Sequence, residues 1–420
     1  MAGFKPIPFL LLSIILSFRL VAQPENEIDW LYEIDLLGKE LAQRHSNLFF
    51  QTDSSTFYSE LDQIAIDTGE ISLFDKSIRL QQVVAKLGDA HTRINYHFNI
   101  SPNTILPLEF YWFEDGIYVI KSRVEYQELL GKRLVAINEF PLKRIIDSLT
   151  TLIVVENPSL IKSQLPRMLT WKPLLDYFGF SGKNGLLLAY ETNDGAIGNL
   201  VVKLHNEEGE EMSIPTGNLP LGWENQNTFF RDRFFPNDRI YYIQYNKCWS
   251  REAEEDYGTG ASALFMPSFK EFEKKVFRTI KKQNIDKLVF DMRYNGGGHP
   301  EQGTKFIKKL SKTRFNGLGE FYVLIGRQTF SAAIVNTVDF MKHTDALLIG
   351  EGTSGKPNHY GEIKRFVLPE SKLVVNYSTH YFQLLDEDIV SITPDIETPI
   401  TISQFMQGID PAIEVIRNQQ

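Results

Sequence analysis

The chain has little of several residue patterns that mark common function classes. It holds one cysteine, Cys248, in 420 residues, so no disulfide can form within the chain. The formal net charge is −9 and no cluster of Lys or Arg stands out, which disfavours nucleic-acid binding because phosphate contacts need clustered cations. No His, Cys, Asp or Glu grouping has zinc spacing, and the sequence predicts neither a metal nor another cofactor.

Long apolar runs are also lacking after the N-terminus, so no later segment is predicted to span a membrane. The N-terminus itself has a positive charge at Lys5, an apolar run from Ile7 to Phe18 and a plausible cut after Ala22. Residues 1–22 are therefore predicted to be a signal peptide, which implies an exported protein of the periplasm or the extracellular space. An uncleaved anchor is the alternative.

The composition, 43% hydrophobic and 23% charged, is that of an ordinary globular protein. Apolar residues recur at helical spacing in Ile28–Asn47, Phe57–Ile66 and Ser72–Leu87, and Gly88 is a natural helix stop. Residues 24–100 are therefore predicted to form an N-terminal helical region.

The period changes to that of strands in residues 101–230, which predicts a β-rich module. Leu106–Phe113 and Ile117–Ile120, with a turn at 114–116, are typical of a β-hairpin. The segment from Leu130 to Leu142 resembles the closing half of a PDZ domain, and any strand–turn–strand is the alternative interpretation. Thr216–Arg233 is loop-like and is predicted to be a linker.

From about residue 235 to 420, short buried apolar runs alternate with helical patterns, which predicts an α/β layer architecture. The central stretch there runs from Phe321 to Tyr360. Ser331 stands at the predicted turn between a strand and a helix, where a hydroxyl is exposed beside backbone N–H groups that lack helical partners. An acyl-transfer nucleophile needs this arrangement. Taken alone, the stretch favours the alternative that Ser331 is a helix N-cap.

Three motifs occur in order along the chain: Gly88-Asp-Ala-His-Thr92, Asp291-Met-Arg-Tyr-Asn-Gly-Gly-Gly298, and Thr329-Phe-Ser-Ala332 followed by Gly350-Glu-Gly-Thr-Ser-Gly-Lys356. Together they resemble the C-terminal-processing (tail-specific) serine peptidases and the related tricorn core peptidases. The resemblance implies an α/β catalytic core of the ClpP/crotonase-like type at residues 235–420, beside the helical region and the PDZ-like module.

The same resemblance implies roles for individual residues. Ser331 would be the nucleophile, and the backbone N–H groups of Ala332 and Gly297 would form the oxyanion hole. The substrate-binding residues are expected to be Gly296, Gly298 and His359.

The general base is left open between two candidates that the resemblance implies. In the tail-specific branch it is a lysine, here Lys356, in a Ser–Lys dyad with Ser331. In the tricorn branch it is a histidine, here His91, oriented by an acidic residue, here Asp388, in a Ser–His–Asp triad.

Each of these residues also has a structural interpretation without catalysis. His91 could bridge backbone groups, Lys356 could be a solvated turn lysine, and Asp388 could be a solvated loop carboxylate. Asp291 and Arg293 are predicted to hold their loop by an ion pair.

The function expected from these observations is that of an exported serine endopeptidase acting on polypeptides through an acyl-enzyme. If the PDZ-like module captures a carboxylate, cleavage would lie near protein C-termini. The alternative is an inactive protein on the same fold that binds peptides or apolar ligands, for which the 30 Phe and 17 Tyr residues would suit an apolar groove.

Overall fold

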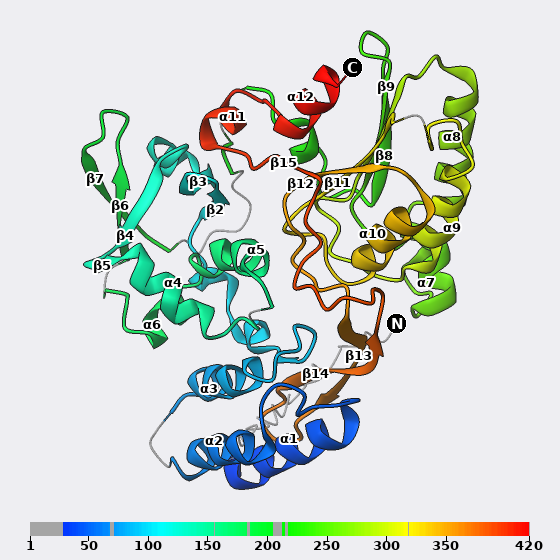
Figure 1. Ribbon diagram of the computed structural model, residues 1–420. Coiled ribbons are helices and arrows are strands. Elements are labelled where there is room, and N and C mark those ends of the chain that lie inside the picture. The colour runs from blue at the N-terminus through cyan, green and yellow to red at the C-terminus, as the bar shows by residue number, and fades with distance from the viewer. Residues whose placement is uncertain are drawn as a thin grey trace, which may run out of the picture.

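The computed structural model describes residues 28–67, 71–154, 156–182, 185–204, 212–214, 217–317 and 319–419. The predicted signal peptide lies outside the described residues. Three sheets organise the chain, and each has its own helices around it (Figure 1).

The largest α/β layer is a six-stranded sheet in the order β15-β12-β11-β10-β9-β8. Every neighbouring pair is parallel except β8 with β9, which is antiparallel at the edge. The strands are β8 Phe230–Phe235, β9 Ile240–Tyr245, β10 Lys287–Asp291, β11 Phe321–Ile325, β12 Leu347–Gly350 and β15 Ile396–Glu397.

Alternate residues of these strands face opposite sides of the sheet, as strand geometry requires. Tyr241 and Ile243 point into the cluster formed with one set of helices, α8, α9 and α10. Tyr242 points to the other face, which the C-terminal helix α12 covers with Ile413 and Ile416. The helices around this sheet are α7 Arg251–Tyr257, α8 Phe269–Lys282, α9 Glu301–Leu310, α10 Ala332–His343 and α12 Pro411–Asn418.

A second, six-stranded antiparallel sheet forms the middle module, in the order β2-β3-β4-β6-β7, with β5 paired to β4 off this path. The predicted hairpin is confirmed, since Phe113 pairs with Gly116 across the turn. The strands are β2 Leu108–Phe113, β3 Gly116–Ser122, β4 Arg133–Ile137, β5 Phe140–Pro141, β6 Leu186–Glu191 and β7 Ile197–Val202. The helices are α4 Leu142–Thr150, α5 Pro158–Met168 and α6 Lys172–Tyr177.

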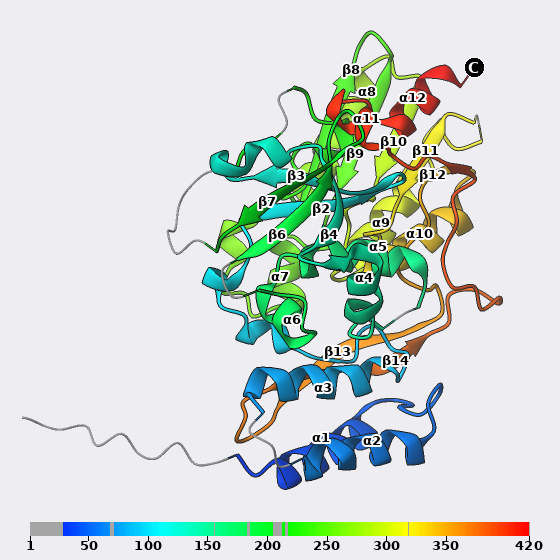
Figure 2. The ribbon, with the colours of Figure 1, turned by 90° about the vertical axis from the view of Figure 1, so that its left-hand side faces the viewer.

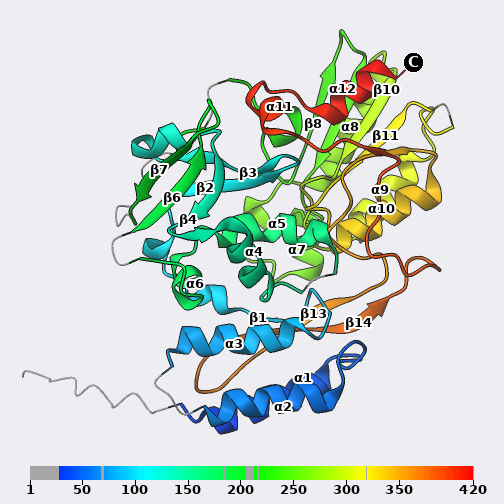
Figure 3. The same cartoon turned by 60° about the vertical axis from the view of Figure 1, so that its left-hand side comes forward.

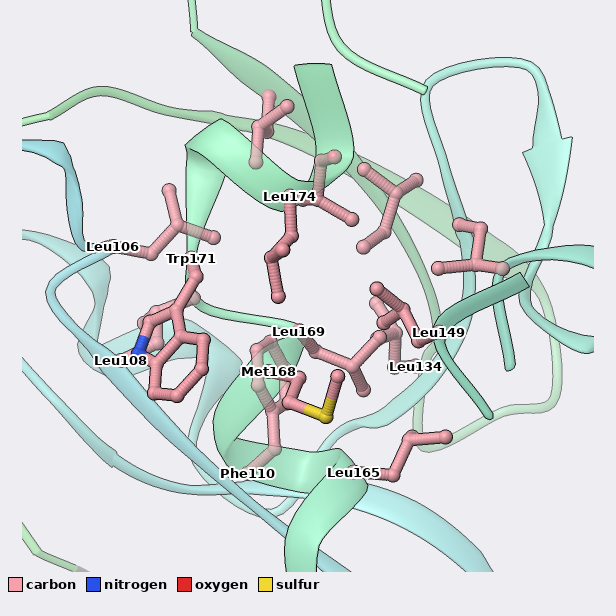
Figure 4. Close-up of a cluster of buried hydrophobic side chains, with 14 of the residues drawn as sticks. Leu106, Leu108, Phe110, Leu134, Leu149, Leu165, Met168, Leu169, Trp171 and Leu174 are labelled. Atoms are coloured by element: carbon pink, nitrogen blue, oxygen red, sulfur yellow. The ribbon is translucent and has the colours of Figure 1, made fainter. Parts of the chain in front are cut away.

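The middle module has its own hydrophobic core, in which side chains from the sheet interdigitate with those of its helices. Figure 4 shows Leu134 of β4, Leu165 and Met168 of α5, and Trp171 and Leu174 around one centre. Helix α5 lies on the side of this module that faces α10 (Figure 3). Its first turn is held there because the Asn157 side-chain amide donates to the carbonyls of Ser354 and Val390.

The N-terminal helical region is confirmed as three helices, α1 Trp30–Arg44, α2 Ser54–Ile66 and α3 Leu73–Ala85. Its core is completed by a hairpin from far along the chain, β13 His359–Val367 and β14 Val374–Phe382. Leu368, Leu373 and Val375 pack among the helices. Figure 2 shows the β13–β14 hairpin beside α3. The short strand β1 Arg93–Ile94 pairs with β14. Residues inside the segment 235–420 therefore belong spatially to the region predicted at 24–100.

The remaining C-terminal segment also crosses between modules. Helix α11, Ile402–Met406, places Phe405 against Phe113 and Ile120 of the middle sheet. The chain also has short 3-10 helices, η1 to η5, at Tyr96–Asn99, Pro102–Thr104, Val124–Leu129, Leu221–Trp223 and Ala263–Phe265. Across the described residues, none of the helices has the length and apolar character needed to cross a membrane.

Candidate active site

Ser331 occupies the turn between β11 and α10 in a backbone conformation that is unusual for a residue with a side chain. Its φ is 55° and its ψ is −126°. Such left-handed conformations cost energy in non-glycine residues and are concentrated at functional sites. Among the described residues, the hydroxyl of Ser331 has no hydrogen-bond partner and does not cap α10. Ser331 thus stands at the N-cap position of α10, as the alternative interpretation has it, but its side chain makes no capping hydrogen bond.

The turn is fixed by hydrogen bonds to the strand end that precedes the triple-glycine loop. The hydroxyl of Thr329 donates to the carbonyl of Met292 and accepts from the N–H of Gly326. The N–H of Phe330 donates to the carbonyl of Asn295 at 3.1 Å. These contacts place the second sequence motif directly beside Ser331.

The backbone of the triple-glycine loop lies so close to Ser331 that it leaves no room for a side chain at Gly297. A β-carbon built on Gly297, whose φ is +104°, would lie 2.8 Å from Cβ of Ser331 and 3.1 Å from the Ala332 nitrogen. The N–H of Ala332 donates to no acceptor among the described residues. It is therefore available for a developing oxyanion.

The second predicted oxyanion donor, the N–H of Gly297, already has a hydrogen-bond acceptor within the protein. The N–H of Gly297 donates to Oδ1 of Asn295 at 2.9 Å. Asn295 is fully buried, and its own side-chain amide donates to the carbonyl of Tyr245. The pairing of Gly297 with Asn295 leaves Ala332 as the free amide of the two.

The other predicted loop glycines differ in surroundings. Gly296 is exposed, with nothing within 4 Å of a built β-carbon, and it lines a cavity beside the site. Gly298 forms a parallel bridge with Cys248, and a β-carbon there would collide with the Cys248 carbonyl. Cys248 is fully buried, and burial raises the pKa of its thiol to about 12.

His91 reaches the same place from the N-terminal region. Its ring stacks on Phe330, the residue before Ser331, with centroids 4.7 Å apart, and on His359 at 5.7 Å. Only 4% of His91 is exposed, and neither ring nitrogen has a hydrogen-bond partner. Burial lowers the pKa of His91 to about 4, more than the nearby carboxylate of Asp89 raises it. His91 is therefore a neutral imidazole at pH 7, able to accept a proton.

Lys356 and Asp388 are paired with each other rather than with the serine or the histidine. Nζ of Lys356 lies 3.4 Å from Oδ1 of Asp388, and the Asp388 side chain is 67% exposed. Because both ring nitrogens of His91 are unpartnered, the structure gives His91 no hydrogen bond from Asp388. The carboxylate nearest to the His91 ring is instead Asp89, whose Oδ1 is 3.8 Å from Nδ1.

The loop that carries Lys356 still belongs to the site. The N–H of Ser354 donates to the carbonyl of Thr329, and a β-carbon on Gly355 would press on Ile334 and Phe330. His359, two residues after Pro357, is buried and donates from Nδ1 to the Pro357 carbonyl at 3.0 Å. The three motifs that the sequence singled out thus meet at one turn.

Two carboxyl groups of the site had no predicted role. Asp89 is buried and accepts from Nε2 of His45 at 3.1 Å and from the hydroxyl of Thr92. Glu156 accepts from the N–H of Ala90 at 3.2 Å, and its Oε2 is buried without a partner. Burial raises the pKa of Glu156 to about 7. Asp89 stands inside the quoted histidine motif, whereas no motif marks Glu156.

The predicted ion pair of the loop is confirmed and extended. The Arg293 guanidinium bonds Asp291 at 2.7 Å and also Asp410 at 2.8 Å, just before α12. Both carboxylates are buried, so the network ties the end of β10 to the C-terminal helix. Among the residues that the structure describes, no group of three or more His, Cys, Asp or Glu side chains could hold a metal ion.

Comparison with solved structures identifies the fold. The chain matches mature CPAF complexed with lactacystin at a TM-score of 0.64 and 14% identity, covering 92% of this chain and 96% of that one. Mature CPAF matches at a TM-score of 0.63 and 13% identity, covering 92% and 95%. The photosystem II D1 C-terminal processing protease matches at a TM-score of 0.41 and 12% identity, covering 92% and 99%.

The chain therefore shares the fold of mature CPAF, along nearly the whole length of both chains. The predicted resemblance to C-terminal-processing peptidases is confirmed at the level of the fold. No protein-family model matches the sequence, and no curated protein matches it.

Proposed function

We propose that this protein is an exported serine endopeptidase that hydrolyses peptide bonds through an acyl-enzyme at Ser331. The observation that carries the proposal is the hydroxyl of Ser331. It is held at a left-handed turn without a hydrogen-bond partner, beside the free N–H of Ala332 and against the backbone of Gly297. A structural serine would use its hydroxyl to cap the helix, and this one does not.

In the reaction, Oγ of Ser331 attacks the scissile carbonyl and its proton passes to the general base. The negative charge that develops on the carbonyl oxygen is stabilised by the N–H of Ala332. The amine leaves with the proton from the base, and water then hydrolyses the ester in a second cycle of the same steps.

His91 is the better supported of the two bases. A base must be unprotonated at working pH, and the lowered pKa of His91 keeps it so. Lys356 is paired with the carboxylate of Asp388 rather than with the serine or the histidine. We assign Lys356 and Asp388 to a supporting ion pair. Both ring nitrogens of His91 are unpartnered in this structure, so the proposed Ser331–His91 hydrogen bond would have to form on substrate binding.

The finer features of the architecture follow from the same proposal. The parallel sheet of residues 235–420 would be a core of the ClpP/crotonase type, and the middle module would be PDZ-like and present substrate polypeptides to the cleft. Export would place the enzyme in the periplasm or outside the cell, with residues 1–22 removed as a signal peptide.

A fluorophosphonate probe tests the nucleophile. The native protein should be labelled at Ser331, Ser331→Ala should not, and the exposed control Ser101→Ala should be labelled like the native protein. An unlabelled native protein would favour the alternative, a binding protein that does not cleave.

Hydrolysis of a labelled unfolded protein tests the base. His91→Ala should lose at least 100-fold in kcat, the usual contribution of a general base, and Lys356→Met should lose far less. The reverse order would assign the proton transfer to Lys356.

A further inference from the structure

The cleft beside the candidate active site has an excess of positive charge that the protein does not neutralise. A cavity of about 580 Å³ is lined by Gly296 and Phe330 and also by Arg93 of β1 and Arg167 of α5. Those same two arginines also line a second cavity of about 350 Å³. The two spaces share six residues, so they adjoin one another at the arginines.

The second cavity has no acidic residue in its lining. Its basic groups are Arg93, Arg167 and His97, and none of these three has an ion pair or side-chain hydrogen bond within the described part of the chain. Tyr96 is the other titratable residue of the lining. Burial, and then the positive charges of both arginines, lower the pKa of His97. The three groups therefore lie close enough to interact electrostatically.

The first cavity also has more cationic than carboxylate side chains in its lining. Its one carboxylate, Glu109, is paired with Lys121 at 2.6 Å, while the Arg327 guanidinium is paired with Glu351. Lys162 adds a further cation without an ion pair among the described residues. In a chain whose formal net charge is −9, this accumulation of unneutralised cations is local to the cleft.

The two arginines line the cavities with side chains that are exposed to solvent. The guanidinium of Arg167 lies over the Trp171 ring at 5.3 Å from its centroid, which supports one face of this cation. Because neither arginine is paired with a carboxylate among the described residues, both can form charge-assisted hydrogen bonds with an incoming anion.

One part of the second cavity's lining is apolar. It includes Leu152, Leu160, Met168 and Trp171, of which Figure 4 labels Met168 and Trp171. The polar side chains of Gln81, Ser163 and Gln164 line the same cavity. A pocket that has both an apolar wall and two arginines matches an apolar amino-acid side chain next to a carboxylate.

We propose that Arg93 and Arg167 bind a carboxylate of the peptide substrate, next to an apolar residue that enters the second cavity. The proposal rests on the proposed peptidase function and names its substrate class. The carboxylate has two sources with the same chemistry, the free C-terminus of a polypeptide or an acidic side chain within it.

Binding measurements separate this proposal from catalysis. The full chain carrying Ser331→Ala is titrated with fluorescent peptides of one sequence, ending in an apolar residue, in two pairs. The first pair differs only in a C-terminal acid or amide. The second pair has an amidated terminus and differs only in Asp or Asn beside the apolar residue.

One of the two carboxylate peptides should bind on the order of 10- to 100-fold more tightly than its neutral partner, the range of a charge-assisted hydrogen bond. That preference should fall by a similar factor in Arg93→Gln and in Arg167→Gln, and partly return in Arg93→Lys. The control Arg278→Gln, on the outer surface of α8, should keep it. Each variant is checked for an unchanged Tm.

The pair that shows the preference identifies the source of the carboxylate. Equal binding of acid and neutral peptides in both pairs, including no measurable binding of any, overturns the proposal, as does a preference that survives both glutamine variants. Failure of Ser331 to react with a fluorophosphonate would overturn the peptidase function and leave this binding result as it stands.

Discussion

A β-carbon on Gly297 would stand 2.8 Å from Cβ of Ser331, nearer than such atoms approach in real proteins. The absence of a side chain at Gly297 is thus a condition for the serine turn to exist in its present form. This relationship joins the triple-glycine motif to the serine motif by packing, apart from any chemistry.

Gly297→Ala should therefore abolish activity, and its neighbour provides the control. At Gly297 the new methyl group meets Ser331 and the Phe330 carbonyl, and the φ of +104° is unfavourable for alanine. At Gly296 nothing lies within 4 Å of a built β-carbon. We expect fluorophosphonate labelling to fall at least 100-fold in Gly297→Ala and to stay within about threefold in Gly296→Ala. Equal labelling of the two variants would contradict the packing argument.

Glu156 should make stability depend on pH with a defined sign. Its pKa is raised to about 7 from the ordinary 4.5, so the folded state binds the proton more tightly than the unfolded state. Its contribution to stability is full below pH 4.5 and is lost as pH rises to about 7.

Relative to the native protein, Glu156→Gln should thus gain stability between pH 4.5 and 7.5, by at most about 3 kcal/mol. Urea unfolding across that range measures the gain. Glu109→Gln, at the exposed pair with Lys121, should show no such slope, and a flat difference for Glu156→Gln would mean that the carboxyl is ionised in the fold.

The Arg293 network should be costly to break. Asp410→Asn removes one of two buried carboxylates from a guanidinium that the protein surrounds, leaving its charge under-compensated. We expect a loss of about 3 kcal/mol in the free energy of unfolding. Asp147→Asn, which breaks the exposed pair with Lys143, should cost no more than about 0.5 kcal/mol. Similar losses in the two variants would mean that the network adds little.

The β13–β14 hairpin should be essential to the N-terminal helices. Leu368 is fully buried in their core, whereas the preceding Val367 is 52% exposed. Leu368→Ala should lower the free energy of unfolding by about 2–5 kcal/mol, and Val367→Ala by less than about 0.5 kcal/mol. Chemical denaturation followed by circular dichroism measures both. Should the two alanine variants unfold alike, the hairpin would not be part of that core.

The local elements were predictable from the sequence because their patterns are short-range. Ile240–Tyr245, Lys287–Asp291 and Phe321–Ile325 are apolar runs that read as buried strands, and each is a strand of the core sheet. The helix after Ser331 was predicted in the same way. Helices α11 and α12 were not predicted.

The motifs also identified which residues gather at the site, but not their partners. Gly297, Ser331 and the loop before Lys356 meet as the resemblance implied. The pairing of Asp388 with Lys356 depends on how two separate loops fold toward each other, and the bond from the Gly297 N–H to Asn295 depends on the local loop conformation. Glu156 could not be found, because only burial against the His91 loop perturbs it.

The sequence by itself determined the strands of the core sheet, the three N-terminal helices and the serine turn, since these depend on the pattern of neighbouring residues. Only the tertiary structure decided where the β13–β14 hairpin packs, which carboxylate lies near His91 and that Arg93 and Arg167 face a common cleft. The physical reason is that burial, ion pairing and pKa are set by what surrounds a side chain in space. Those surroundings come from residues hundreds of positions away.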